Sequence, residues 1–169
     1  MRYCIVTVMA ILMSMVGTIG FAAIPRSELA LGGVTLFTRF ANVRQIYGEP
    51  TRTSYNDMYI WGGTVRFYAQ YYGNGSFWAM ATNRDGVLSV TTTANNGIGT
   101  PAGIKVGMSV GRLSMVYGEA DYIDEDKNGD SVFHYNERKT GVGCRDSLDF
   151  TVRDGRIIEI SLVAGVLYI

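Results

Sequence analysis

Two stretches of the chain repeat apolar residues at helical spacing. The apolar positions are Phe40, Val43, Ile46 and Tyr47 in the first stretch, and Val110, Leu113, Val116 and Tyr117 in the second. A glycine follows each stretch, Gly48 or Gly118, and glycine readily takes the left-handed conformation that closes a helix. Thr38 and Ser109 are candidate N-caps. The pattern predicts two short helices of about nine residues, each with one apolar face.

Runs of β-branched and aromatic residues follow each helix and are separated by turn-forming residues. The predicted strands are 51–55, 58–61, 65–72, 77–82 and 87–92 after the first helix, and 121–126, 130–135 and 156–163 after the second. Asn56-Asp57 predicts a turn between the first two strands, and Asn128-Gly129 is a strong hairpin signal. Each helix is therefore expected to precede three or four antiparallel strands.

The two halves of the chain also share short identical segments in the same order. Tyr47-Gly48-Glu49 corresponds to Tyr117-Gly118-Glu119, and Arg84-Asp85-Gly86 corresponds to Arg153-Asp154-Gly155. Such periodic self-similarity indicates an internal repeat. We therefore expect an α+β fold of two tandem repeats, residues 27–96 and 100–169. Each repeat would be a short helical segment followed by a three- or four-stranded antiparallel sheet, in two layers.

One segment resembles a known family. The run 104–120 contains an apolar-x-apolar triplet, Gly107-Met108-Ser109, a short helix and Gly118-Glu119-Ala120. This order resembles the opening of the SmpA/BamE-like module, and two such modules resemble the tandem layout of β-lactamase inhibitory protein-like proteins. Phe37-Thr38 departs from the motif in the first repeat, and Ala120 departs from it in the second. The resemblance implies an extracytoplasmic protein-binding role without catalytic machinery.

The N-terminus carries a targeting pattern. Residues 3–24 contain no charged side chain, and Arg2 precedes them. Small residues follow the apolar centre, and Gly20-Phe21-Ala22 forms a cleavage motif. We expect residues 1–22 to be a signal peptide cleaved after Ala22, so the protein would be secreted or periplasmic. The alternative is an uncleaved anchor, because 22 uncharged residues are long enough to cross a bilayer.

Composition excludes two classes of protein. The chain has 169 residues, 15 basic and 15 acidic side chains, and a formal net charge of zero, and 47 % of its residues are hydrophobic. An intrinsically disordered protein would be poor in apolar residues. A protein that binds nucleic acid mainly through charge needs a basic excess. A search for phosphate-binding glycine motifs finds none, so no cofactor is expected.

The candidate catalytic and metal-binding residues are few. His134 is the single histidine, and a hydrolase would need Cys144 or Ser147 to approach it. His134 is interpreted as a surface or hairpin residue, and Cys144 is interpreted as a small buried residue. The acidic segment 124–130 resembles the start of a calcium loop, but Tyr135 occupies the twelfth position, where that loop needs glutamate. We interpret the segment as an acidic hairpin tip and expect no metal site.

Aromatic residues are concentrated in the first half. Residues 55–78 contain Tyr55, Tyr59, Trp61, Phe67, Tyr68, Tyr71, Tyr72, Phe77 and Trp78, whereas residues 125–147 contain Phe133 and Tyr135. Strand alternation places Arg66, Tyr68, Gln70 and Tyr72 on one face, which their polar character suggests is exposed to solvent. The sequence predicts a binding face formed by these four residues, with Trp61 as a fifth candidate.

Four functions remain open from the sequence. The favoured one is a non-enzymatic module that binds another envelope or extracellular protein, because exposed tyrosine and tryptophan are enriched at interfaces. The alternatives are a carbohydrate- or cell-wall-binding protein, a self-associating envelope protein, and a hydrolase that uses His134. No nucleic acid is expected as a partner. Contact with a membrane is expected only through an uncleaved signal segment.

Overall fold

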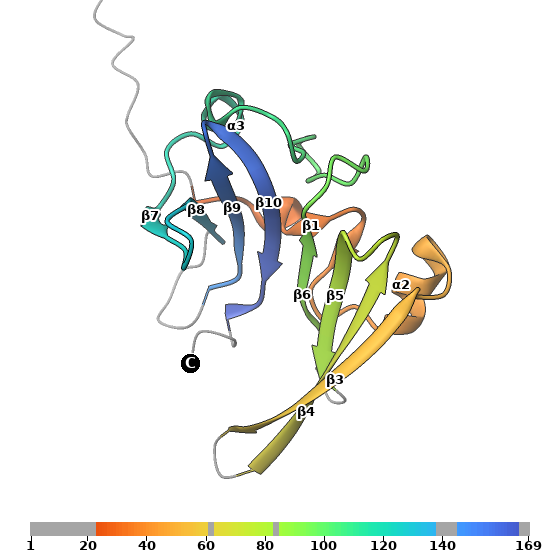
Figure 1. Ribbon diagram of the computed structural model, residues 1–169. Helices are drawn as coiled ribbons and strands as arrows, with labels where there is room; N and C mark the ends of the chain where they lie inside the picture. Colours follow the sequence, from red (N-terminus) through yellow and green to blue (C-terminus); the bar gives the residue numbers. More distant parts are fainter. Residues whose placement is uncertain (1–22, 61–62, 83–84, 138–144, 166–169) are drawn as a thin grey trace, which may run out of the picture.

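The computed structural model describes residues 23–60, 63–82, 85–137 and 145–165 (Figure 1). Two short α-helices lie at the predicted positions, α2 (Phe40–Tyr47) and α3 (Val110–Tyr117). A 3-10 helix, η1 (Arg26–Glu28), and a small hairpin of β1 (Ala30–Leu31) and β2 (Val34–Thr35) precede them. The prediction of two short helices is confirmed.

Strands make up most of the regular structure. The eight longer strands are β3 (Arg52–Ile60), β4 (Gly63–Tyr72), β5 (Phe77–Thr82), β6 (Gly86–Thr92), β7 (Tyr122–Glu125), β8 (Ser131–Asn136), β9 (Ser147–Arg153) and β10 (Arg156–Val163). They form one antiparallel sheet in the order β3-β4-β5-β6-β10-β9-β8-β7. Strands β6 and β10 pair in its middle, and β3 and β7 are its two edges (Figure 1).

The predicted α+β fold of two tandem helix-and-sheet repeats is wrong. The protein is mostly β, and the strands of segments 27–96 and 100–169 belong to one eight-stranded sheet. The joining contacts run from Ser89 to Thr92 on β6 and from Ile160 to Val163 on β10. Each of these strands would otherwise leave a bare edge of unpaired backbone groups next to apolar side chains, so they pair with each other.

One strand differs from its predicted boundaries in a way that affects the functional surface. The predicted turn at Asn56-Asp57 is absent, and β3 runs without interruption from Arg52 to Ile60. Its nine residues all pair with β4 in a regular register. Asparagine and aspartate favour turns locally, but the continuous pairing with β4 overrides that preference.

The main core lies between the helices and one face of the sheet. Val43 of α2 and Leu113 of α3 are fully buried in it, together with Phe77 and Phe150 from the sheet. The β1–β2 hairpin adds Leu31 and Val34 to this core. A smaller apolar cluster around Phe67 lies apart from the main core. The remainder of the sheet's second face carries many polar side chains.

Candidate functional site

The hairpin of β3 and β4 extends beyond the body of the sheet (Figure 1). It carries exposed aromatic side chains. Strand β5 pairs with β4 only from Phe67 onward, so the outer half of the hairpin is a two-stranded ribbon. Tyr55 is 67 % exposed, Met58 is 49 % exposed and Tyr59 is 74 % exposed. Large apolar side chains gathered on one exposed element are typical of an interaction surface.

An ion pair and two rings define one face of the β3–β4 hairpin. Arg66 donates from Nε and Nη2 to the two carboxylate oxygens of Asp57, at 2.6 and 2.7 Å. Its guanidinium carbon lies 4.6 Å from the ring centre of Tyr55, which is directly opposite Tyr68. The hydrogen bonds lower the pKa of Asp57 and raise the pKa of Arg66, so both remain charged at neutral pH. The face therefore presents aromatic rings beside two opposite charges that are paired with each other.

The residues predicted to form the binding face do not share one environment. Arg66 is exposed, and Tyr68 is partly buried near it. Gln70 is 2 % exposed and Tyr72 is 4 % exposed, and the Tyr72 hydroxyl donates to Oε1 of Gln70 at 2.9 Å. The prediction that these two face solvent is wrong, because α2 covers the inner end of β4. The ring centre of Tyr47 on α2 lies 5.6 Å from that of Tyr72.

The structure exposes Tyr55 and Tyr59, which the predicted binding face did not include, whereas it buries Gln70 and Tyr72. Sequence reasoning noted their rings but separated them by the predicted turn at Asn56-Asp57. In the continuous strand their side chains point to the same face, about 13 Å apart along the strand. The fifth predicted residue, Trp61, lies outside the described residues.

His134 occupies a buried position between two carboxylates. The imidazole projects from β8 and contacts a carboxylate through each ring nitrogen. Nδ1 lies 2.9 Å from Oδ1 of Asp149, and Nε2 lies 3.1 Å from Oδ1 of Asp124. The ring of Tyr122 stacks on the imidazole with centres 4.1 Å apart. Burial lowers the pKa of His134, but the two carboxylates outweigh burial and raise that pKa above its ordinary value.

This arrangement holds three neighbouring strands together. Asp149 lies on β9 and Asp124 on β7, so the imidazole connects both strands to β8. A histidine acting as general base needs a ring nitrogen next to a nucleophile. Here carboxylates engage both nitrogens. Ser147 is buried on β9, and Cys144 lies outside the described residues.

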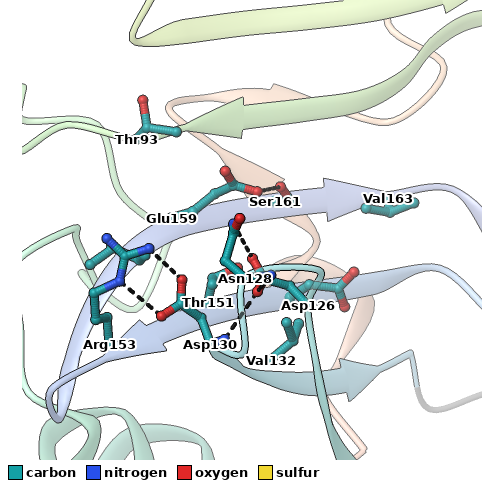
Figure 2. A pocket seen from close by; sticks show the side chains of 12 residues that line it. Thr93, Asp126, Asn128, Asp130, Val132, Thr151, Arg153, Glu159, Ser161 and Val163 are labelled. Atoms are coloured by element: carbon teal, nitrogen blue, oxygen red, sulfur yellow. Dashed lines mark hydrogen bonds and ion pairs between the residues drawn. The ribbon is translucent and has the colours of Figure 1, made fainter.

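The acidic segment forms a compact hairpin tip (Figure 2). Asp126 Oδ1 accepts hydrogen bonds from the backbone N–H groups of Asn128 and Asp130, at 2.7 and 3.0 Å. Arg153 donates to both carboxylate oxygens of Asp130, at 2.8 and 2.5 Å. The carboxylate of Asp126 therefore stabilises the turn, and that of Asp130 forms an ion pair. Within the described part of the chain, no group of three or more potential ligand residues is placed to hold a metal ion.

A hollow borders this tip on the sheet face opposite the main core. Figure 2 shows the side chains that line it. Glu159 and Ser161 line it from β10, and the Ser161 hydroxyl donates to Oε1 of Glu159 at 3.3 Å. Burial raises the pKa of Glu159. Its lining consists mainly of carboxylates and hydroxyl groups, with Arg153 as the cation.

The predicted signal peptide, residues 1–22, lies outside the described residues. No helix in residues 23–60, 63–82, 85–137 and 145–165 is long and apolar enough to cross a membrane.

Comparisons with known proteins assign no family. No family model matches the sequence, and no curated protein matches it. Among solved structures, the chain is similar to the crystal structure of the uncharacterized protein YfeY from Escherichia coli. The TM-score is 0.47 and the identity 16 %, covering 83 % of this chain and 99 % of that chain. The resemblance to SmpA/BamE-like modules stays a prediction.

Proposed function

We propose that this chain is an exported, non-enzymatic protein-binding module whose partner docks on the β3–β4 hairpin. The proposal rests on one observation. Tyr55 and Tyr59 are 67 % and 74 % exposed on one face of the β3–β4 hairpin, and Met58, which is 49 % exposed, lies on its other face. Exposed tyrosines supply a large contact area at low entropic cost and are frequent interface anchors.

The chemistry of the hairpin supports a protein ligand. The Arg66–Asp57 ion pair holds the guanidinium beside the Tyr55 ring before a partner binds. Such preorganisation lowers the entropic cost of association. Charges that already neutralise each other also limit the desolvation cost of covering them.

The double substitution Tyr55→Ala with Tyr59→Ala tests the proposal. Removing anchor rings from an interface typically costs 2 kcal/mol or more, so capture of the partner should weaken at least about tenfold. Loss of the cross-strand contact with Tyr68 should lower the unfolding free energy by only about 1 kcal/mol. The partner is isolated from an envelope extract with the wild-type chain, identified by mass spectrometry, and then titrated in purified form by calorimetry.

A matched control removes exposed apolar side chains elsewhere. Ile46 on α2 and Met115 on α3 are 52 % and 79 % exposed. The double substitution Ile46→Ala with Met115→Ala should leave the affinity unchanged. Equal weakening by both double variants would contradict the assignment of the partner to the hairpin.

A glycan ligand is the second candidate, and the spacing of Tyr55 and Tyr59 on one face favours it over the remaining alternatives. Two exposed rings about 13 Å apart could stack on separate sugar units of one chain. Binding of the wild-type chain to a glycan array, lost in the same tyrosine variant, would replace the protein partner with a saccharide.

A further inference from the structure

The two edges of the eight-stranded sheet differ in their protection. At one end, β7 has four residues, and two of them, Asp124 and Glu125, are acidic. At the other end, β3 has nine residues, and residues 52–59 are all exposed. Proteins normally protect edge strands from pairing with other chains by keeping them short, charged, bulged or interrupted by proline. Strand β7 follows this rule, whereas β3 does not.

The sequence of β3 contains no proline, and its pairing with β4 shows no register shift. Arg52 and Asp57 are its charged residues, and Asp57 is already neutralised by Arg66 across the ribbon. In the described part of the chain, no other strand pairs with the outer side of β3. Its outward backbone N–H and C=O groups therefore form an open template for one more strand.

We propose that β3 binds its partner by strand addition, in which an extended segment of another protein becomes the ninth strand of the sheet. This inference rests on the proposed function, since it specifies how a protein ligand would bind the same hairpin. Main-chain hydrogen bonds to β3 supply affinity, and the side chains beside the added strand select its sequence.

The side chains of β3 specify an amphipathic partner strand. Residues directly opposite each other in a sheet lie on the same face. Tyr55 and Tyr59 share one face, so the partner's residues there are apolar. Arg52 lies on the other face with its guanidinium carbon 4.0 Å from the ring centre of Tyr71. Among the described residues, no carboxylate lies within ion-pair distance of Arg52, so an acidic side chain of the partner fits beside it.

The same argument disfavours the β3 strand of a second copy. On the Arg52 face β3 presents Ser54, Asn56 and Met58. Its single acidic residue, Asp57, lies on the opposite face and is occupied by Arg66. An antiparallel pair of two β3 strands with matching faces therefore offers no carboxylate to Arg52. A strand from another protein supplies the better complement.

A synthetic peptide tests strand addition directly. The probe is a ten-residue peptide with valines on one face and threonines on the other, carrying a glutamate at each end of the threonine face. Either strand direction then brings one glutamate close to Arg52. On titration into the full-length protein, alternate backbone amides of β3 should exchange with deuterium at least about tenfold more slowly. A control peptide with two central prolines should have no such effect.

Charge reversal supplies the second readout. The wild type should bind the glutamate peptide about threefold more tightly than a matched lysine peptide, as expected for an exposed ion pair. The Arg52→Glu variant should reverse that preference while keeping the wild-type thermal stability within a few degrees. An unchanged preference in Arg52→Glu would overturn the assigned partner chemistry.

Other outcomes overturn strand addition while leaving the proposed function intact. If the natural partner depends on Tyr55 and Tyr59 but leaves β3 amide exchange unchanged, the rings bind it without an added strand. If β3 amides become protected with protein concentration alone, a second copy occupies the edge. If neither the glutamate peptide nor the lysine peptide slows exchange of the β3 amides at millimolar concentration, β3 does not accept a strand.

Discussion

The imidazole of His134 connects three strands through contacts that depend on its protonation. When charged, it donates from Nδ1 to Asp149 and from Nε2 to Asp124. When neutral, it carries one proton, so one carboxylate faces a ring nitrogen lone pair instead. Because the folded state raises the pKa of His134, the charged form is bound more tightly in the folded protein than in the unfolded chain.

This gives the first prediction at the residue scale. The contribution of His134 to stability is complete below its unfolded pKa, near 6.5, and is lost as pH rises through the higher folded value. Urea unfolding of the wild type should therefore show a decrease in unfolding free energy from pH 6 to pH 9. In the His134→Gln variant this decrease should be smaller. Asp124, Asp149 and Tyr122 face the imidazole, and all three are retained in the variant. Parallel pH profiles would contradict a stabilising contact between the charged imidazole and the two carboxylates.

The second prediction at this scale concerns Gly86, at the start of β6. Its φ is +74°, and an added Cβ would lie 2.6 Å from the carbonyl oxygen of Phe37. That oxygen belongs to the backbone and cannot move without breaking local structure. We expect Gly86→Ala to reduce the unfolding free energy by roughly 2–3 kcal/mol. Gly75 has φ +80° and open space around it, so Gly75→Ala should cost only about 1 kcal/mol. Urea denaturation of both variants measures the difference.

The local sequence pattern identifies which residues of β4 share a face, but not which parts of that face are exposed to solvent. Arg66, Tyr68, Gln70 and Tyr72 do lie on one face, as their alternation indicates. Along that face the environment changes from solvent at Arg66 to a closed contact with Tyr47 of α2 at Tyr72. The helix that covers Tyr72 comes from a distant part of the pattern. Alternation along one strand therefore contains no information about it.

The two helices differ chiefly in how they begin. Each has eight residues and ends before a glycine with φ of 78°. The Ser109 hydroxyl accepts a hydrogen bond from the Arg112 N–H at 3.2 Å, which confirms Ser109 as the N-cap of α3. Thr38 does not cap α2. Its hydroxyl contacts that of Thr35, and Arg39 occupies the N-cap without a side-chain hydrogen bond.

A prediction at the element scale follows from that difference. Ser109→Ala removes a formed cap and should lower the unfolding free energy by about 1 kcal/mol. Arg39→Ser introduces a capping hydroxyl where none is used and should raise the unfolding free energy by about 0.5 kcal/mol. Urea unfolding at pH 7 measures both effects. Changes of the same sign would show that helix capping does not control these two positions.

Elements bounded by strong local signals were predictable. Strands β5 and β10 begin and end at the predicted residues, and β7 and β8 flank the predicted Asn128-Gly129 turn. The sequence prediction divided β3 because Asn56 and Asp57 are individually typical of turns. Pairing with β4 across both residues decides the structure there. The exposed site on β3 was missed for the same reason.

At the scale of the whole molecule, the pairing of β6 with β10 makes a single sheet. Four residue pairs form this junction, and the hydroxyls of Thr91 and Ser161 are 2.9 Å apart across it. The main core is also continuous across the junction, since Leu31 and Val34 are buried in one cluster with Phe150. Sequence pattern located both strands but could not show that they are neighbours.

A fragment ending at residue 96 tests this continuity. It would expose the β6 edge and remove Ile104 and Leu113 from the shared core. We expect the fragment to lack cooperative unfolding and a dispersed NMR spectrum, because the exposed edge and lost core contacts remove most of its stabilisation. The full-length chain is the control. A well-dispersed spectrum and a sharp thermal transition for the fragment would indicate an independent domain.

The strand order also has a consequence for how fast the protein folds. Six of the seven pairings in the large sheet join strands that are consecutive in sequence, and β6 with β10 is the exception. Thr91 and Ser161 are 70 residues apart along the chain, so their pairing must overcome the largest loop-closure entropy in the sheet. Hairpins on either side can form early, and we expect the docking of β6 on β10 to limit the folding rate. Destabilising substitutions at the β6–β10 junction should slow folding, whereas destabilising substitutions in the β3–β4 hairpin should chiefly accelerate unfolding.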